Sequence, residues 1–325
     1  MANSILRIGT RESPLAVWQA TQVQHLLIAA NIQSQLVYIK SEGDTDTITP
    51  LYALGVQGIF TKTLDAALLN NRIDIAVHSL KDVPVQMAEG IIQAAVLKRG
   101  NYKDIFVYKD EADLKKLGFI NNEWTTDRQS QFLNHDSSFT IATSSIRRIA
   151  QWENRYPNTT IQNLRGNVNT RLRKLKESEW NGAIFAAAGL ERINLRPKNA
   201  IDLDWMLPAP AQGAIAVVCK KDDEQSYNFS QSFNDKETAL CVKLERDFLR
   251  ALSGGCSTPI SALAIIKNNQ LVFKGSVLST DGKQKMEIEK KVATTNADDL
   301  GIIAGEEILS RGADKIIEQI RNAHT

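Results

Sequence analysis

The segment Asp74-Ile75-Ala76-Val77-His78-Ser79-Leu80-Lys81-Asp82-Val83-Pro84 decides the fold of this chain. Its apolar run, 73–77, ends abruptly in His, Ser, Lys and Asp, and Pro84 disfavours a helical continuation. The pattern is typical of a buried strand that delivers polar side chains to the carboxyl end of a sheet, where open α/β sheets bind ligands. Taken alone, the segment is equally consistent with a strand followed by a solvated turn.

The residues before this strand extend the same pattern. We expect a first strand at 6–9, then Thr10-Arg11-Glu12-Ser13-Pro14 and an amphipathic helix to about residue 30, because Ser13 suits an N-cap and Pro14 a first helical position. Further strands are predicted at 36–39 and 91–97 and a helix at 60–70, which together indicate a parallel sheet covered by helices. The long polar loop 41–57 is predicted to form a mobile lid.

A second unit with the same opening begins near Asp104. Residues 119–138 are polar and are predicted to form a surface insertion, after which a strand at 140–142 leads through Thr143-Ser144-Ser145 into a helix with Arg147 and Arg148. Strand-to-helix turns are also predicted at 164–167 and 186–189, and residues 214–218 are predicted to return to the first sheet as a strand. Helix starts of this kind suit carboxylate or phosphate ligands.

The character of the sequence changes from about residue 235. One helix, with Leu240, Leu244, Phe248 and Leu252 on one face, ends at Ser253-Gly254-Gly255, and Cys256 follows. Alternating segments at 261–266, 271–278 and 286–292 predict an antiparallel sheet, and a helix at about 297–311 is expected to pack on it. These residues predict a small α+β domain with Cys256 at its edge.

Composition excludes several classes of function. The 325 residues carry a net charge of +2, which argues against a nucleic-acid surface over the whole protein, so any cationic site has to be local. No apolar run approaches the length of a membrane span and there is no signal-peptide core, so we expect a cytoplasmic protein that binds neither membrane nor nucleic acid. The histidines show no metal-ligand spacing, Cys219, Cys241 and Cys256 form no CxxC pair, and the common nucleotide-binding motifs are absent.

Arginines recur at predicted strand ends and helix starts in both units. Any single surface arginine more often makes a weak solvated ion pair, but six in corresponding positions predict a ligand with several carboxylates or phosphates, which guanidinium groups bind bidentately. The six are Arg11, Arg147, Arg148, Arg165, Arg171 and Arg192.

Two further residues carry candidate chemistry. Asp82, among these arginines, is expected to stay ionised and to stabilise a cation on the substrate or to move a proton, the alternative being a structural salt bridge. Cys256 follows two glycines and precedes Pro259, which is unlike a buried core cysteine. Because no histidine base can be assigned to it, covalent attachment of a group fits better than hydrolytic turnover.

Together these residues resemble the porphobilinogen deaminase (hydroxymethylbilane synthase) family. The resemblance runs along nearly the whole chain and rests on six motifs in order: 7–16 (RIGTRESPLA), 78–84 (HSLKDVP), 143–148 (TSSIRR), 164–168 (LRGNV), 212–214 (QGA) and 254–256 (GGC). It implies two periplasmic-binding-protein-like α/β lobes around a cleft, domain 1 at 1–101 with 214–231 and domain 2 at 102–213, and a small C-terminal α+β domain 3 at 232–325. A monomer is expected.

The resemblance also implies the chemistry. A dipyrromethane cofactor is held by a thioether at Cys256, porphobilinogen loses ammonia to give an azafulvene, and the terminal pyrrole attacks it. Four rounds and a hydrolysis release hydroxymethylbilane, with Asp82 as the catalytic residue. Cofactor binding is implied for Cys256, Lys81, Asp82, Ser145, Arg147, Arg148, Arg165, Gly166 and Arg171, and substrate binding for Arg11, Ser13, Gln19, Arg165, Arg171, Arg192 and Gln212; no metal is implied.

The chain departs from the family pattern at two places. Ala53 and Gln57 stand in the loop where relatives commonly carry lysines, and Ala211 precedes Gln212 where a glycine is common. Two other classes of protein compete with the family interpretation. A two-lobed anion-binding protein would not need the third domain with its cysteine, and a thiol hydrolase would need a histidine base.

Overall fold

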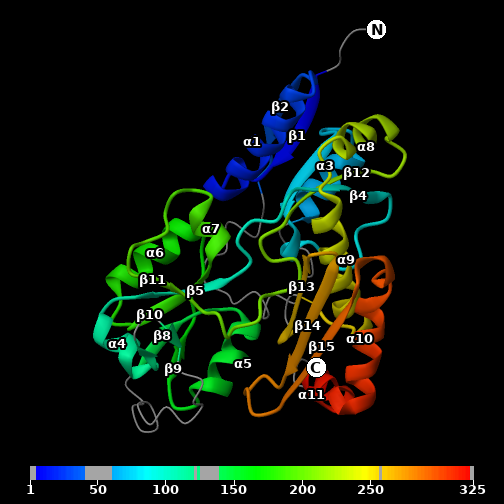
Figure 1. Cartoon of the computed structure of the whole chain (residues 1–325). Coiled ribbons are helices and arrows are strands. Elements are labelled where there is room, and N and C mark those ends of the chain that lie inside the picture. Colours follow the sequence, from blue (N-terminus) through cyan, green and yellow to red (C-terminus); the bar gives the residue numbers. More distant parts are fainter. Residues whose placement is uncertain (1–4, 41–60, 121–122, 125–138, 256–257, 323–325) are drawn as a thin grey trace.

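A computed structural model of the chain describes residues 5–40, 61–120, 123–124, 139–255 and 258–322. The loop 41–57, with Ala53 and Gln57, and the predicted attachment residue Cys256 therefore lie outside the described residues. Two α/β lobes, one in blue and cyan and one in green, stand beside a unit of three long strands and helices in orange and red (Figure 1). This arrangement confirms the predicted fold class.

The sheet of lobe 1 has the order β2-β1-β3-β12-β4. Strand β1 is parallel to β2 and β3, whereas β12 is antiparallel to both β3 and β4. The four strands predicted to form a parallel sheet do run in the same direction, and the predicted return strand is confirmed as β12, which enters from lobe 2 and runs antiparallel to them. The strands are β1 (Leu6–Thr10), β2 (Ser34–Tyr38), β3 (Ile75–Ser79), β4 (Ile91–Val96) and β12 (Ile215–Lys220).

Lobe 2 repeats this plan, with the order β9-β8-β10-β5-β11. Strand β8 is parallel to β9 and β10, and β5 is antiparallel to β10 and β11. In each lobe the fourth strand follows a crossover from the other lobe, since β5 comes after β4 and β12 comes after β11. The strands are β5 (Asp104–Tyr108), β8 (Thr140–Ala142), β9 (Thr160–Gln162), β10 (Gly182–Ala186) and β11 (Ala200–Asp202).

Helices follow the strands as the sequence predicts, and several of them are capped by the residues that lead into them. Ser13 accepts a hydrogen bond from the amide of Ala16 at the start of α1, and Asn167 accepts one from the amide of Thr170 at the start of α6. Lobe 1 contains α1 (Pro14–Ala29), α3 (Lys62–Leu69) and α8 (Glu224–Gln231). Lobe 2 contains α4 (Glu111–Lys116), α5 (Ile146–Arg155), α6 (Val168–Glu177) and α7 (Ala187–Glu191).

The predicted insertion at 119–138 is described only in part, and that part carries two aromatic side chains that pack inward. Strands β6 (Phe119–Ile120) and β7 (Glu123–Trp124) form a hairpin. Trp124 packs edge-on against Trp205, and its indole Nε1 donates to the carbonyl of Asp202 over 2.8 Å. Phe119 and Trp124 are partly buried and pack against the core of lobe 2, whereas Ile120 and Glu123 are exposed, so this hairpin lies at the surface and is anchored by two aromatic rings.

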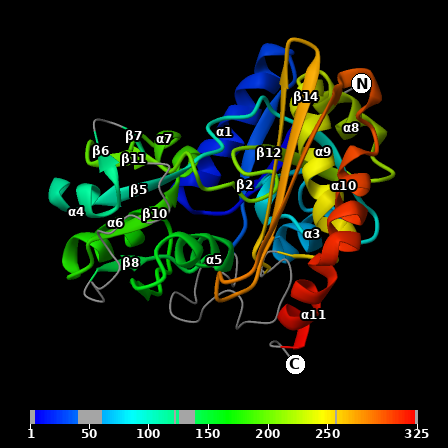
Figure 2. The same cartoon turned by 60° about the horizontal axis from the view of Figure 1, so that its bottom comes forward.

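Helix α9 (Lys236–Ala251) opens the third unit, and the antiparallel strands β13 (Ile260–Lys267), β14 (Gln270–Leu278) and β15 (Lys285–Ala293) confirm the predicted sheet. Phe248 of α9 packs on Phe273 of β14 with ring centroids 5.4 Å apart. Figure 2 shows α9 and α10 beside the three strands. The predicted last helix is α10 (Leu300–Ile308), and a further helix, α11 (Asp314–Asn322), follows a turn at Gly312, whose φ is 109°. The residue bounds of the three domains stay a prediction.

Candidate active site

The central strand of lobe 1 delivers Lys81 and Asp82 to the space between the lobes. Strand β3 passes into a short 3₁₀ turn, Leu80–Asp82, in which Leu80 is buried while Lys81 and Asp82 are half-buried. The turn is held on both sides. The amide of Leu80 donates to the carbonyl of Ala214 before β12, over 3.1 Å, and Arg246 of α9 donates to the carbonyls of Val83 (2.9 Å) and Pro84 (2.7 Å). Domain 3 therefore fixes the backbone that carries Asp82.

Arg147 and Arg148 meet a carboxylate that the sequence did not single out. The side chain of Asp104, at the start of β5, has no exposed area, and its oxygens lie 2.7 Å from Nη2 of each arginine. The other terminal nitrogen of each guanidinium, Nη1, donates to a main-chain carbonyl. Arg147 donates to Leu207 over 2.8 Å and Arg148 donates to Ile184 over 3.0 Å. Both predicted ligand-binding arginines are thus buried members of an ionic cluster.

Gln212 links this cluster to lobe 1. Its Nε2 donates to Asp104 Oδ1 over 2.9 Å and to the carbonyl of Tyr102 over 2.8 Å. Its Oε1 accepts a hydrogen bond from Lys81 Nζ over 3.3 Å. One amide on the second crossover therefore bridges a cation of lobe 1 and the arginine pair of lobe 2.

Arg171 lies one turn into α6, beside the turn that contains Arg165. Its Nε donates to the carbonyl of Gly166 over 2.7 Å. Gly166 has a φ of 107°, and a Cβ at this position would stand 2.7 Å from Thr170 Cγ2, so only glycine suits the turn. Burial and the charges of Arg148 and Arg165 together lower the pKa of Arg171 to about 10, and the charge of Asp82 acts against them. Arg171 of lobe 2 therefore lies within electrostatic reach of Asp82 of lobe 1.

The two lobes also set the protonation of Lys81 and Asp104. Burial lowers the pKa of Lys81 to about 8, with the Asp82 and Asp104 charges acting against the neighbouring arginines. For Asp104, burial alone would raise the pKa, but the charges of Arg147 and Arg148 and the hydrogen bond from Gln212 bring it down to about 2. Asp104 is therefore a permanent carboxylate at physiological pH, whereas Lys81 titrates just above it.

Arg11 and Ser13 come from the first strand-to-helix connection, and Gln19 lies in the second turn of α1. Ser13 caps α1, and Gln19 donates to Ser79 Oγ over 2.8 Å, so Gln19 supports the end of β3. Burial, with a contribution from the charge of Arg11, lowers the pKa of His78 to about 4. His78 is consequently neutral at physiological pH and is a poor candidate for a general acid.

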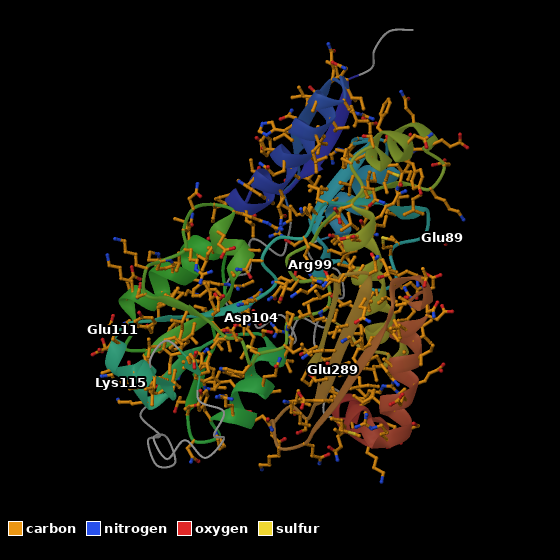
Figure 3. All side chains as sticks on the ribbon, in the orientation of Figure 1. Glu89, Arg99, Asp104, Glu111, Lys115 and Glu289 are labelled. Carbon is orange, nitrogen blue, oxygen red and sulfur yellow. The ribbon has the colours of Figure 1, made fainter. Side chains whose placement is uncertain are left out.

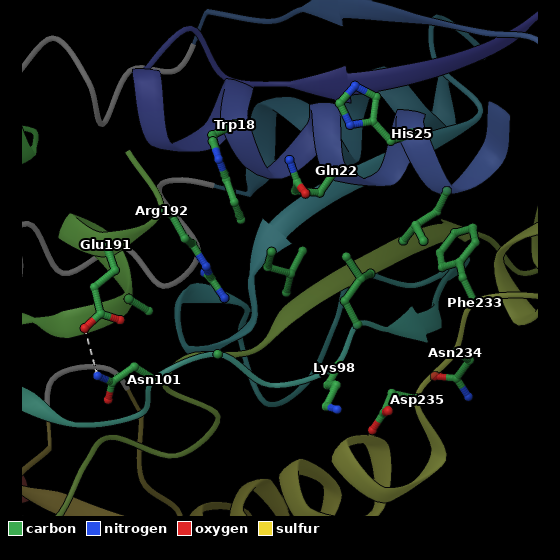
Figure 4. A pocket seen from close by; sticks show the side chains of 15 residues that line it. Trp18, Gln22, His25, Lys98, Asn101, Glu191, Arg192, Phe233, Asn234 and Asp235 are labelled. Carbon is green, nitrogen blue, oxygen red and sulfur yellow. Dashed lines mark hydrogen bonds between the residues drawn. The ribbon is translucent and has the colours of Figure 1, made fainter. Parts of the chain in front are cut away.

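Arg192 lies apart from the arginine cluster. It lines a pocket of about 660 Å³ between α1, α7, the first crossover and the start of α9, where Trp18, Glu191 and Asp235 are also found (Figure 4). Its Nη2 donates to the carbonyl of Gly213 over 2.6 Å, and its guanidinium stands 5.7 Å from the centroid of the Trp18 ring. None of Lys81, Asp82, Arg147, Arg148, Arg165 or Arg171 lines this pocket.

Sequence reasoning also missed a second buried carboxylate, Glu245 of α9. It accepts a bidentate ion pair from Arg99 at 2.5 and 3.0 Å, and hydrogen bonds from the amides of Ala211 (2.6 Å) and Ala264 (2.7 Å). It thereby joins both crossovers to domain 3. A signal existed, because Glu245 shares a helical stripe with buried Cys241 and Phe248, where a lone carboxylate needs buried partners.

Metal binding has no support in the described part of the chain, where no group of His, Cys, Asp or Glu is arranged to hold an ion. Cys219 and Cys241 are buried, and burial raises the pKa of the two thiols to about 11 and about 12. Both are therefore poor nucleophiles at neutral pH. Among the helices that the structure describes, none is long and apolar enough to cross a membrane.

Comparison with known proteins adds a family and structural neighbours. The profile described as "Porphobilinogen deaminase, dipyromethane cofactor binding domain" matches residues 6–228, and "Porphobilinogen deaminase, C-terminal domain" matches residues 239–310. The VFT2 domain of BvgS from Bordetella pertussis, as a double mutant, is 12% identical, with 74% of this chain and 93% of that chain covered and a TM-score of 0.40. A methionine-bound nutrient binding protein from Burkholderia cenocepacia is 14% identical, with coverages of 69% and 92% and a TM-score of 0.40. From the two profile matches, the chain belongs to the porphobilinogen deaminase family, whose first domain binds a dipyrromethane cofactor.

Proposed function

We propose that this chain is a transferase that joins four porphobilinogen molecules head to tail on a dipyrromethane bound at Cys256 and releases hydroxymethylbilane by hydrolysis. The observation that carries the proposal is the meeting of cations from both lobes around one half-buried carboxylate, Asp82. We further propose that it acts as a cytoplasmic monomer. The family membership supports the reaction, and the geometry supports the residue roles below.

The cationic side chains suit a ligand rich in carboxylates. Five cationic side chains lie within electrostatic reach of one another or of two carboxylates, so positive charges outnumber negative ones. The cations are Lys81, Arg147, Arg148, Arg165 and Arg171, and the carboxylates are Asp82 and Asp104. In the described chain, the Nε atom of Arg147 is buried without a hydrogen-bond partner, so the cluster retains a donor. The excess of positive charge fits the acetate and propionate groups of pyrroles.

These residues would hold the dipyrromethane, with Ser145 and Gly166 at the two helix starts beside it. When bound, that group supplies the nucleophilic pyrrole carbon to which each new unit is joined. Arg165 and Arg171 would bind carboxylates from the side of lobe 2, and Lys81 from the side of lobe 1. For substrate, Arg11 and Ser13 are the proposed direct contacts. Gln19 and Arg192, which contact Ser79 and Gly213, would act through those partners.

Asp82 is the proposed catalytic residue. Asp104 is buried in ion pairs with two arginines and accepts a hydrogen bond from a glutamine, and His78 is neutral, so Asp82 is the carboxylate best placed to meet a charge that develops on the substrate. Its charge lies within electrostatic reach of Lys81 and Arg171, so the carboxylate has a cation from each lobe beside it. Asp82 would stabilise the cation formed as ammonia leaves and accept the proton released when the new bond forms.

Intact mass under denaturing conditions tests the cofactor and its attachment. We expect the purified protein to exceed its sequence mass by a dipyrromethane unit, and Cys256→Ser to lose that excess together with turnover of porphobilinogen. Cys219→Ser and Cys241→Ser are matched controls, because both thiols are buried and have raised pKa values. An adduct that survives Cys256→Ser would refute the attachment. A protein without any adduct that also fails to consume porphobilinogen would refute the function and leave a two-lobed binding protein.

A further inference from the structure

Asp104 occupies an unusual position for a carboxylate in a site that recognises carboxylates. It is fully buried, and its nearest charged partners, Arg147 and Arg148, are residues that the sequence assigns to the ligand. It stands at the first residue of β5, where the first crossover enters lobe 2, and Figure 3 labels it at the inner edge of that lobe. No substrate role is needed to explain its presence, but its contacts have a consequence for the site.

The first consequence concerns the arginines. Asp104 Oδ1 accepts from Nε (3.1 Å) and Nη2 (2.7 Å) of Arg148, and Oδ2 lies 2.7 Å from Nη2 of Arg147. With the carbonyls of Leu207 and Ile184 on the far side, each guanidinium is fixed in both position and plane. Two buried arginines side by side repel each other, and the carboxylate of Asp104 offsets this repulsion because it pairs with both.

The second consequence concerns Lys81. The same Oδ1 atom accepts from Gln212, whose other amide atom accepts from Lys81. The groups that face Lys81 are therefore Asp82 on its own turn, Arg147 and Arg148 of α5, Asp104 of β5, and the Gln212 amide. A chain of contacts thus runs from lobe 2 through both crossovers to the turn that carries Asp82.

We infer that Asp104 is a positioning residue of the site: through Arg147 and Arg148 directly, and through Gln212 to Lys81, it holds cations from both lobes in one preset geometry for the carboxylates of the pyrrole ligand. This inference rests on the proposed function for the identity of the ligand. A buried ion pair can also serve folding alone. A positioning role makes two demands that a purely structural ion pair does not. Loss of the Asp104 charge has to weaken the binding of the ligand, and it has to change the protonation of Lys81.

The test compares Asp104→Asn with Asp247→Asn in the full chain. Asp247 of α9 is a matched control, because it is also a buried carboxylate with two cationic partners, Lys243 and Arg250, but lies outside the site. Steady-state kinetics with porphobilinogen should show KM raised at least about ten-fold in Asp104→Asn, with a smaller change in kcat, because binding geometry is lost before chemistry. Asp247→Asn should leave KM within two-fold or so of the parent.

A second readout does not depend on turnover. The pH dependence of acetylation of Lys81 by acetic anhydride, followed by peptide mass spectrometry, gives the pKa of that amine. Because the Asp104 charge raises that pKa and the arginines lower it, Asp104→Asn should shift the Lys81 profile to lower pH. Asp104→Glu restores the charge and should restore most of the Lys81 profile, while KM recovers less because the longer side chain displaces the arginines.

If Asp104→Asn does not fold, Gln212→Leu tests the same path with the ion pairs intact. It removes the acceptor of Lys81 Nζ and should likewise shift the acetylation profile to lower pH and raise KM. Where both variants fold, the double variant should resemble Asp104→Asn alone, since the two residues act in one chain of contacts.

The outcomes separate this inference from the proposed function. If the parent carries the adduct and turns over porphobilinogen, but folded Asp104→Asn or Gln212→Leu keeps both the parental KM and the parental Lys81 profile, the positioning role is overturned. If the parent neither carries the adduct nor consumes porphobilinogen, the proposed function fails first. The acetylation profile then still reports whether Asp104 controls Lys81.

Discussion

The two lobes share one strand plan but place different chemistry on it. In lobe 1 the central strand β3 ends in Lys81 and Asp82, whereas the equivalent strand of lobe 2, β10, ends in alanines at 186–188. In lobe 2 the ionisable groups come instead from the ends of β8 and β9, which lead to Arg147, Arg148 and Arg165. The same scaffold thus puts the proposed catalytic carboxylate on one lobe and most of the cations proposed to bind carboxylates on the other.

The lobes also differ in how their charges are balanced. The arginine pair of lobe 2 is neutralised in part by Asp104, which arrives on the crossover strand β5. The turn of lobe 1 is held by main-chain contacts, with Arg246 of domain 3 donating to the carbonyls after Asp82. The arginine pair of lobe 2 is therefore held by buried ion pairs, while the turn with Asp82 is held by hydrogen bonds to its main chain. The division of roles can be tested one lobe at a time.

The largest effect is expected in lobe 1, at Asp82. Asp82→Asn keeps the shape and removes the charge, so kcat should fall by about two decades or more while the cofactor mass is retained, the scale expected for the loss of a positioned charge or proton acceptor. Single-turnover kinetics together with intact mass will check this. Near-parental kcat in a cofactor-loaded Asp82→Asn would end the division of roles between the lobes.

In lobe 2 we expect a smaller effect that falls on binding, at Arg171. Arg171→Leu should raise KM for porphobilinogen about ten-fold or more, since charge-assisted hydrogen bonds contribute about 1.5–3 kcal/mol each. Arg171→Lys should rescue poorly, because an ammonium cannot reproduce the guanidinium fork that also contacts the Gly166 carbonyl. Arg173→Leu, two residues along and exposed, serves as the control. Full rescue by lysine would mean that charge alone matters here.

A pH dependence sharpens the comparison, because Lys81 is the cation of lobe 1 that titrates near neutrality. With its pKa lowered to about 8, Lys81 should bind carboxylates fully below that pH and lose them above it, so KM should rise on the alkaline side. The same shift makes the free energy of unfolding depend on pH. The folded protein binds the Lys81 proton less tightly than the unfolded chain does, so the charged amine destabilises the fold below about pH 8. The destabilisation disappears as the pH rises from about 8 to the ordinary lysine pKa of 10.5. Lys81→Arg should move the alkaline rise of KM to higher pH, and a rise unchanged by that substitution would assign it to another group.

The smallest effect is expected at the crossover that joins the lobes. Ala211 has a φ of 61°, a left-handed conformation that costs a non-glycine residue about 1–2 kcal/mol. Ala211→Gly, which restores the residue common in the family, should raise the free energy of unfolding by up to about 1 kcal/mol, since glycine also adds entropy to the unfolded chain. Urea unfolding measures the change, and KM should stay near the parental value. A destabilised Ala211→Gly would show that the buried alanine methyl contributes more than its strain removes.

Much of this protein could be predicted from its sequence by itself. Local patterns were sufficient for the strand into Lys81 and Asp82, the capped helix after Ser13, the strand-to-helix turn at Gly166 and the antiparallel sheet of domain 3, because each depends on neighbouring residues along the chain. The candidate ligand-binding residues were found for the same reason. They stand directly after apolar strands, where an ionisable side chain is conspicuous.

The tertiary structure alone decided which of these residues meet and what lies between them. Asp104 begins an ordinary apolar strand, and nothing local shows that Arg147 and Arg148, about forty residues later, will share its carboxylate. Glu245 joins two crossovers that are separated by more than a hundred residues. Arg192 belongs to the strand-end pattern but lies in a pocket with Trp18. Such partners depend on how β5 and β12 cross between the lobes. The arginines that meet Asp104 there keep its carboxyl ionised against the effect of burial, and burial in the same space lowers the pKa of Lys81.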